Sequence, residues 1–314
     1  MRKPGRLLIG ASIALLTVIW GTTWAGIRIS LQGIPPLSGV SLRFALASLL
    51  LFAFARALGV PLRAAHRRER WLRLIHAVLS FTISYGVVFW CEQWVPSGVA
   101  AVLFATFTLM VAVMAHFLLP GERMTALGFV GVAVGLAGVA IIYAEDFDLL
   151  GGDRVAVASV VMLAAPLASA AANVAVKRWG ADLHPVSLNA AAMGMGCGLI
   201  GAVALVAERQ RPLQLDPAPV AALVYLAVAG SAVTFSLYYW LMRHMQVSRL
   251  ALIGYGTPVV ALFVGAMWLD EPLPPRALLG SLLVVIGVAC AARRPRGKHA
   301  DEAPASLDAG PGEL

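Results

Sequence analysis

Charged residues are scarce in this chain of 314 residues. Asp, Glu, Lys and Arg together make up 13% of it, whereas hydrophobic residues make up 60% and the mean hydropathy is +0.83. Soluble domains carry about 25% charged residues, so this chain lacks the polar side chains that would cover a water-exposed surface. The composition excludes an ordinary soluble domain and predicts a membrane protein.

Cysteine is scarce as well. Cys91, Cys197 and Cys290 are widely separated and show no metal-ligand spacing. The sequence therefore predicts no disulfide framework, no metal site and no cofactor. The net charge of +8 suggests a nucleic-acid partner at first sight, but the basic residues follow the pattern of a membrane topology, so we expect no such partner.

Ten apolar runs of about 20 residues follow one another, and each is long enough to cross a hydrocarbon core of roughly 30 Å. They are 7–28, 36–57, 71–93, 96–119, 124–143, 155–176, 185–206, 218–242, 249–269 and 275–292. One such run could be a buried helix of a soluble protein. Ten in succession predict an all-α polytopic membrane protein with ten transmembrane helices in a lipid bilayer. The first run has no prompt cleavage site and is expected to remain as a helix.

The distribution of Lys and Arg predicts the orientation. With the N-terminus inside, 18 basic residues fall in cytoplasmic segments, 5 fall in outer segments, and Arg43 lies within a span. Cytoplasmic loops carry the excess of positive charge, so both termini are expected in the cytoplasm. Residues 294–314, rich in Pro, Ala, Gly and charge, are expected to form a disordered cytoplasmic tail.

A shift of 149 residues brings matching residues of the chain into line. It aligns Arg28 with Lys177, Pro36 with Pro185, Ser38 with Ser187, Thr108 with Thr257, Glu122 with Glu271 and Gly131 with Gly280. Charged, proline and glycine matches at one common shift favour a duplication over chance similarity between alanine-rich helices. We expect two five-helix repeats, residues 1–146 and 147–293.

Five spans per repeat is an odd number, so the second copy must enter the membrane from the opposite side. The predicted architecture is therefore two inverted five-helix repeats related by a pseudo-two-fold axis in the membrane plane. That arrangement is characteristic of secondary transporters, which hold their substrate near the midplane and open alternately to either side.

Several stretches resemble a known family. They are "IWGTTW" in the first span, "LRF" at 42–44, "PSGVAAVLFATFTLMVAVMAHFLLPGERMTALGFVGVAVGLAGVAII" at 96–142 and "YGTPVVALFVGAMWLDEPLPPRALLGSLLVVIGV" at 255–288. In them the chain resembles the EamA family of the drug/metabolite transporter superfamily. The resemblance implies a multi-pass carrier of the bacterial inner membrane, usually an exporter of amino acids or other small metabolites. The family commonly has proline where this chain has Leu109, while the second copy keeps Pro258.

Acidic residues are absent from the middle of the predicted spans, and Glu92 lies at the outer end of the third span. A carrier of organic cations, or a carboxylate-driven proton antiporter, would use a buried acid. The sequence therefore favours facilitated or exchange transport of a neutral or zwitterionic substrate.

Arg43, about seven residues into the second span, is an ionisable residue inside the membrane and therefore a candidate for function. We expect it to attract a carboxylate or phosphate of the substrate, or to pair with Glu92 as an outer gate. Snorkelling outward or bonding to backbone carbonyls is the structural alternative. His76 and His116 could relay protons, but a structural role is favoured for both.

The first span carries an aromatic and polar face. Thr17, Trp20, Trp24 and Arg28 follow helical spacing, and such a face suits a small-molecule cavity. Trp20 lies near mid-span, where an interfacial belt does not explain it. Helix packing is the alternative, and Arg28, the counterpart of Lys177, is assigned to helix termination.

The stretch "GYGTP", residues 254–258, lies at the centre of the ninth span and predicts a helix break with free carbonyls, a common binding device in transporters. Tyr255 and Thr257 correspond to Thr106 and Thr108 at the common shift. The predicted substrate-binding residues are Trp20, Trp24, Arg43, Tyr85, Trp90, Thr106, Thr108, Asn173, Tyr239, Tyr255 and Thr257.

Small residues repeat every fourth position in "GVAVGLAGVA" at 131–140 and in "GMGCGLIG" at 194–201. This spacing favours close helix packing within the bundle and leaves a homodimer interface open. The sequence as a whole predicts a secondary exporter of small metabolites such as amino acids. An intramembrane enzyme is disfavoured because the spans hold no catalytic constellation. A channel-like pore is the other alternative, but bulky aromatics fit an occluded substrate site better.

Overall fold

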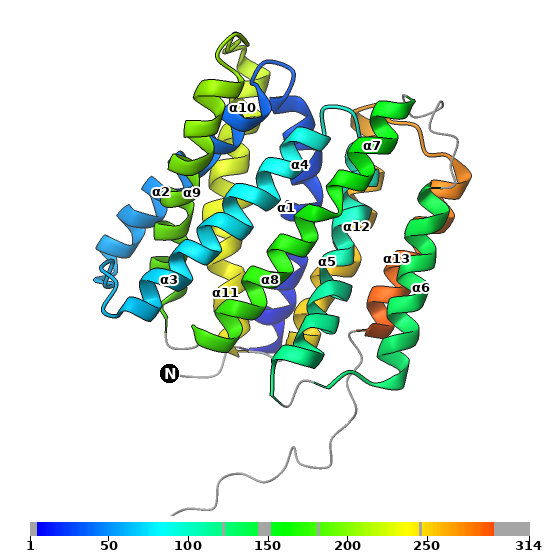
Figure 1. The fold of residues 1–314 in the computed structure, drawn as a ribbon, viewed down its shortest axis with the longest axis horizontal. Coiled ribbons are helices and arrows are strands. Elements are labelled where there is room, and N and C mark those ends of the chain that lie inside the picture. The colour runs from blue at the N-terminus through cyan, green and yellow to red at the C-terminus, as the bar shows by residue number, and fades with distance from the viewer. Residues whose placement is uncertain (1–4, 121–122, 144–151, 181–182, 245–246, 292–314) are drawn as a thin grey trace, which may run out of the picture.

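A computed structural model of the protein describes residues 5–120, 123–143, 152–180, 183–244 and 247–291. All regular secondary structure within these residues is helical, as predicted (Figure 1). The predicted tail at 294–314 lies outside the described residues.

The described helices form long rods joined by short connections. In chain order they are α1 (Arg6–Ser30), α2 (Pro36–Ala57), α3 (Arg67–His76), η1 (Ala77–Ser84), α4 (Tyr85–Cys91), α5 (Ser97–Leu118), α6 (Ala126–Tyr143), α7 (Asp153–Met162), α8 (Ala164–Trp179), α9 (Pro185–Ala207), α10 (Pro217–Ala227), η3 (Val228–Val233), α11 (Thr234–His244), α12 (Val247–Trp268) and α13 (Pro275–Ala291). The segments η1 and η3 are π-helical, and each continues directly from the helix before it into the helix after it.

Several of these rods match the dimensions of a bilayer. Seven are long and apolar enough to cross a membrane, namely Leu7–Ser30, Pro36–Ala57, Arg67–Cys91, Ser97–Leu118, Asp153–Trp179, Pro185–Ala207 and Pro217–Tyr238. Three shorter apolar helices, Ala126–Ile142, Gly256–Trp268 and Pro275–Cys290, fall within the remaining predicted spans. The structure therefore agrees with a polytopic helical membrane protein, while the number of ten spans stays a prediction.

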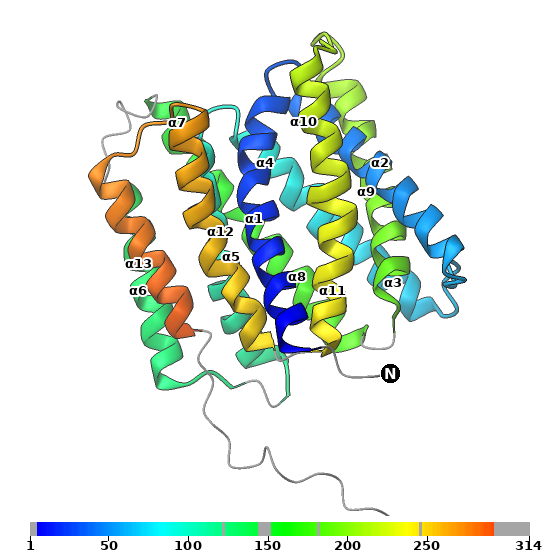
Figure 2. The same cartoon turned by 180° about the vertical axis from the view of Figure 1, so that it is seen from behind.

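The helices pack as a bundle around α1. In Figures 1 and 2, α1 (dark blue) runs through the middle, with α5 and α12 on one side and α10 and α11 on the other. The helices α6 and α13 pack together at one edge, and α2 and α9 pack together toward the opposite edge. Segments far apart in the sequence therefore meet throughout the bundle.

Carboxylates from distant segments hold the first turns of two helices. Glu208, after α9, accepts hydrogen bonds from the backbone N–H groups of Leu37 and Ser38 at the start of α2, both at 2.8 Å. Glu271, between α12 and α13, accepts from the N–H and the hydroxyl of Ser97 at the start of α5, both at 2.8 Å. The first N–H groups of a helix have no partner within it and favour a negative charge, so these contacts fix how the helices are placed.

Glycines allow close approach between two pairs of helices. A methyl group at Gly280 of α13 would lie 2.6 Å from the carbonyl oxygen of Gly138 on α6. A methyl group at Gly194 of α9 would lie 2.9 Å from the hydroxyl of Ser48 on α2. The small-residue stretches at 131–140 and 194–201 thus serve packing within one chain, and the homodimer interface stays an untested prediction.

The two π-helical segments carry matching polar contacts. The hydroxyl of Thr82 donates to the carbonyl of Ala77 at 3.0 Å, and the hydroxyl of Ser231 donates to the carbonyl of Leu226 at 3.0 Å. Thr82 and Ser231 are 149 positions apart, as are Ala77 and Leu226. The wider turn of a π-helix disturbs the regular hydrogen-bond ladder, and π-turns occur often at functional sites.

The helix break predicted at the centre of the ninth span is wrong. The helix α12 is continuous through Pro258. Its glycines serve packing instead, because Gly256 faces Thr17 of α1 and Gly254 lies against Thr108 of α5. Neighbouring helices pack closely on this weakened stretch and support it. Within the described rods, departures from regular α-helix lie in η1, in η3 and at Leu163 between α7 and α8.

Replacing Gly280 by alanine should destabilise the protein by about 1–3 kcal/mol, because the added methyl group forces α6 and α13 apart. Thermal unfolding of the purified protein in detergent measures the effect. Gly198→Ala is the matched control, since nothing lies within 4 Å of a methyl group there. Equal melting temperatures for the two variants would contradict the packing role of Gly280.

Candidate functional site

Arg43 of α2 is a cation buried inside the bundle, with 1% of its surface exposed. Its Nε donates to the hydroxyl of Ser231 at 2.9 Å, and its Nη2 donates to the carbonyl of Gly230 at 3.1 Å. Both partners belong to η3, in the predicted second repeat. The bond to a backbone carbonyl agrees with the structural role considered as an alternative for Arg43. The side chain does not snorkel outward.

Aromatic rings surround the guanidinium of Arg43. Its central carbon lies 4.8 Å from the ring centre of Tyr85, 5.5 Å from that of Phe44 and 5.9 Å from that of Phe89. A desolvated cation over an aromatic face is stabilised by the ring quadrupole. The rings also exclude water, which strengthens every polar interaction that the guanidinium makes.

Gly230 lets two helices reach the same point of η3. A methyl group at this position would lie 2.7 Å from the Cγ2 atom of Thr23 on α1 and 3.4 Å from the Nη2 atom of Arg43. The neighbouring Thr22 bonds to the hydroxyl of Tyr225 on α10. The polar stretch of the first span therefore packs against α10 and η3 rather than facing lipid.

Trp20 and Trp24 occupy different contacts on α1. Trp20 packs against Phe235 of α11, with ring centres 5.9 Å apart, and its buried Nε1 has no hydrogen-bond partner. Phe235 in turn packs against Phe81 of η1 at 5.5 Å. Trp24 packs against Phe104 of α5 at 5.5 Å.

A chain of ring contacts links Trp20 to the arginine. It runs from Phe235 through Phe81 to Phe44, whose ring centre lies 4.9 Å from that of Phe81 and 4.9 Å from that of Tyr85. The structure therefore brings Trp20, Arg43 and Tyr85 into one polar and aromatic cluster, which we call the central cluster.

Other predicted site residues bond within their own helices. The hydroxyl of Thr106 donates to the carbonyl of Leu103 at 2.6 Å, and that of Thr257 donates to the carbonyl of Ile253 at 2.7 Å. The amide of Asn173 likewise donates one turn back, to the carbonyl of Ser169 at 2.9 Å. These bonds use one donor of each side chain, and a substrate role for the three residues stays a prediction.

The remaining predicted residues lie elsewhere or are not described. Trp90 is 38% exposed and packs against Trp94, with ring centres 4.8 Å apart. Thr108 lies against Gly254 of α12. The side chains of Tyr239 and Tyr255 lie outside the described part of the structure. A substrate role for these residues stays a prediction.

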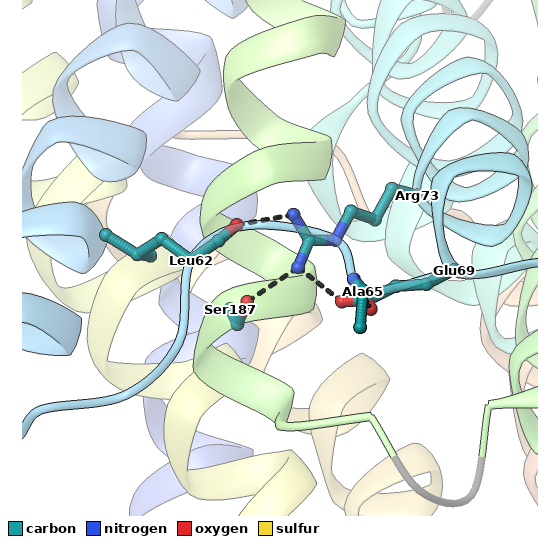
Figure 3. Close-up of polar contacts among 5 residues, drawn as sticks. All are labelled: Leu62, Ala65, Glu69, Arg73 and Ser187. Atoms are coloured by element: carbon teal, nitrogen blue, oxygen red, sulfur yellow. Dashed lines mark hydrogen bonds and ion pairs between the residues drawn. The ribbon is translucent and has the colours of Figure 1, made fainter. Parts of the chain in front are cut away.

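A second buried arginine, Arg73 of α3, bonds to the α2–α3 connection and to the start of α9 (Figure 3). It donates to the carbonyl of Leu62 at 2.6 Å and to the hydroxyl of Ser187 on α9 at 2.8 Å. It also pairs with Glu69, which accepts a bond from the N–H of Ala65 at 2.9 Å. Arg73 thereby ties the α2–α3 connection to the first turn of α9.

The two histidines make contacts of a structural kind. Nε2 of His76 lies 3.3 Å from Oδ1 of Asn189 on α9. Nδ1 of His116 accepts a hydrogen bond from the backbone N–H of Met124 at 2.9 Å. Both observations fit the structural interpretation favoured by the sequence.

The burial of Glu92 was not predicted from the sequence. Glu92 follows the last residue of α4, as expected, but its side chain is 0% exposed and neither carboxylate oxygen has a hydrogen-bond partner. The predicted Arg43–Glu92 pairing is not formed. Glu92 lies at the end of a span, and a helix end can be either exposed or covered by its neighbours. Its position in the sequence therefore does not predict its burial.

Replacing Arg43 by lysine should destabilise the protein by about 1–3 kcal/mol. An ammonium keeps the charge but does not reproduce the planar fork that reaches Ser231 and Gly230 together. Thermal unfolding in detergent measures the loss. The exposed Arg209 provides the control, and Arg209→Lys should change stability by less than about 0.5 kcal/mol. Wild-type stability of Arg43→Lys would show that the bonds to η3 are dispensable.

The chain matches known proteins over nearly its whole length. The model of the EamA-like transporter family matches it twice, at residues 8–144 and 157–293. It is 31% identical over 291 residues to the "uncharacterized inner membrane transporter YedA" of Escherichia coli (strain K12), covering 90% of this chain and 89% of that protein. It is 29% identical over 290 residues to the "probable terminal-alkyne amino-acid exporter" of Streptantibioticus cattleyicolor, covering 92% and 94%.

A solved crystal structure shows the same fold. It superposes with a TM-score of 0.66 and 19% sequence identity, covering 92% of this chain and 97% of the other. Together with the two family matches, the helical bundle and its apolar rods, this likeness gives the assignment that the residue motifs suggested. The chain belongs to the EamA-like transporter family of the drug/metabolite transporter superfamily.

Proposed function

We propose that this transporter is a secondary exporter of small metabolites such as amino acids. It works by alternating access between two inverted five-helix halves, residues 1–146 and 147–293, in the bacterial inner membrane. The observation that carries the proposal is the central cluster, where Arg43 of the first half is buried against η3 of the second. A polar group at such a junction is placed to hold substrate while the halves move around it.

Corresponding elements of the two halves support the inverted architecture. The helices α2 and α9 begin at Pro36 and Pro185, which are 149 positions apart. The hydroxyls of Thr82 in η1 and Ser231 in η3, which each donate to the carbonyl five residues earlier, are separated by the same number of positions. The relative from Streptantibioticus cattleyicolor, described as an amino-acid exporter, supports the substrate class.

Contacts between the halves at both ends of the bundle suit alternating access. At the proposed outer end, Glu208 holds Ser38 and Glu271 holds Ser97. At the proposed cytoplasmic end, Arg73 holds Ser187, which lies 149 positions after Ser38. Rocking of one half against the other would release the contacts at one end and keep those at the other.

Counterflow in proteoliposomes, across a panel of amino acids and related metabolites, tests the proposed transport. We expect exchange of at least one amino acid by the wild type, and a loss of about tenfold or more in Trp20→Ala, which removes a partly buried indole from the central cluster. Trp268→Ala is the matched control, because Trp268 is 73% exposed. No exchange by the wild type, or wild-type exchange by Trp20→Ala, would count against the proposal. Substrate-dependent proton flux would exclude the facilitated or exchange transport that the sequence favours.

The proposed orientation predicts which loops reach the outside of the cell. A membrane-impermeant maleimide applied to intact cells should label Arg211→Cys, in the α9–α10 connection, and should label Arg63→Cys, in the α2–α3 connection, only after the cells are opened. Both positions are exposed, and a background without Cys91, Cys197 and Cys290 removes other thiols. The reverse labelling pattern would refute cytoplasmic termini.

A further inference from the structure

Two buried groups of opposite charge have unused hydrogen-bonding capacity in the same region. Arg43 uses Nε and Nη2 for Ser231 and Gly230, while its Nη1 is buried and has no partner. Glu92 is 0% exposed, and both of its carboxylate oxygens lack a partner. Buried polar groups are normally satisfied, and an unsatisfied charged group is especially costly, so both groups require an explanation.

Arg43 and Glu92 lie on neighbouring helical segments, and no hydrogen bond or ion pair joins them. The helices α2 and α4 pack against each other, and the ring centre of Phe89, one turn before Glu92, lies 5.9 Å from the central carbon of the Arg43 guanidinium. The unused atoms of Arg43 and Glu92 have no partner. The helices thus hold a positive and a negative group apart, at a separation wider than an ion pair.

Two other charged residues, Arg28 and Glu271, influence Glu92 but form no hydrogen bond with its carboxylate. Arg28 of α1 attracts Glu92 but donates a hydrogen bond to its backbone carbonyl, not to the carboxylate. Glu271 repels Glu92, and its own oxygens accept bonds from the first turn of α5. The carboxylate of Glu92 is therefore left available to a ligand.

We propose that Arg43 and Glu92 form a binding site for a zwitterion, in which Nη1 of Arg43 donates to the carboxylate of an α-amino acid and the carboxylate of Glu92 accepts from its ammonium. This inference rests on the proposed function and names the charge pattern of its substrate. A ligand with both charges satisfies both groups, whereas an anion leaves Glu92 unpaired and a cation leaves Arg43 unpaired. Protonation of Glu92 alone would also leave the Nη1 donors of Arg43 without an acceptor.

Ligand binding to the purified protein tests the site directly. The probes are the L-amino acids, and for the tightest binder its amide, which keeps the ammonium, and its 2-hydroxy acid, which keeps the carboxylate. The shift of the melting temperature during titration gives an apparent affinity for each probe. We expect the wild type to prefer the amino acid over both analogues by about tenfold or more, as the loss of one charge-assisted hydrogen bond implies.

Substitution of Glu92 or Arg43 should weaken the preference for the amino acid over one of the two analogues. Glu92→Gln should lower the ratio of amino-acid affinity to 2-hydroxy-acid affinity by about tenfold, because the ammonium has lost its negatively charged partner. Arg43→Gln should lower the ratio of amino-acid affinity to amide affinity in the same way. If Arg43→Gln does not fold, Glu92→Gln alone decides, since glutamine keeps the size and position of glutamate.

Control variants remove a charge of the same kind outside the site. Asp216→Asn and Arg209→Gln change exposed residues and should keep the wild-type ratios. Absence of amino-acid binding to the wild type, or equal losses for all three probes in Glu92→Gln, would overturn the zwitterion site. Binding with the expected ratios but without counterflow would leave the site intact and refute the proposed transport.

Discussion

The buried guanidinium of Arg43 is the interaction on which the centre of the bundle depends. A charge taken out of water is very costly unless it is paired or hydrogen-bonded, and α2 itself offers no free acceptor to it. The π-helical segment η3 supplies two acceptors, the carbonyl of Gly230 and the hydroxyl of Ser231. Because these partners lie on a different helix, a stable Arg43 requires α2 and η3 to stay in contact, with Tyr85 covering the guanidinium.

The same rule explains the rest of the architecture. In a bilayer, backbone polar groups must find partners within the protein, and carboxylates from distant segments supply them at two helix starts. Glu208 and Glu271 accept hydrogen bonds from the first N–H groups of α2 and α5, whereas Arg73 donates to the hydroxyl of Ser187 in the first turn of α9. Glycine pairs such as Gly138 and Gly280 bring backbones close enough for dispersion contacts, which drive helix association where water does not.

The first span shows how packing accounts for polar content in an apolar helix. Gly21 lies against Val260 of α12, Thr22 bonds to Tyr225 of α10, and Thr23 meets η3 at Gly230. Residues 21–27 are mostly buried by these neighbours, so little of this stretch needs to suit lipid. Trp20 keeps an unpaired buried N–H in this enclosure, which is the kind of group that a bound molecule can satisfy.

The sequence by itself determined the helical membrane fold, the approximate limits of the helices and the presence of a charged residue, Arg43, inside the bundle, because these depend on local composition and on the cost of charge in a bilayer. Only the tertiary structure decided that Glu92 is buried, that α12 passes unbroken through Pro258, and that Thr106 and Thr257 bond within their own helices. Those outcomes depend on which faces of distant helices meet. An apolar helix in a membrane carries too little amphipathic pattern to reveal its inward face before its neighbours are known.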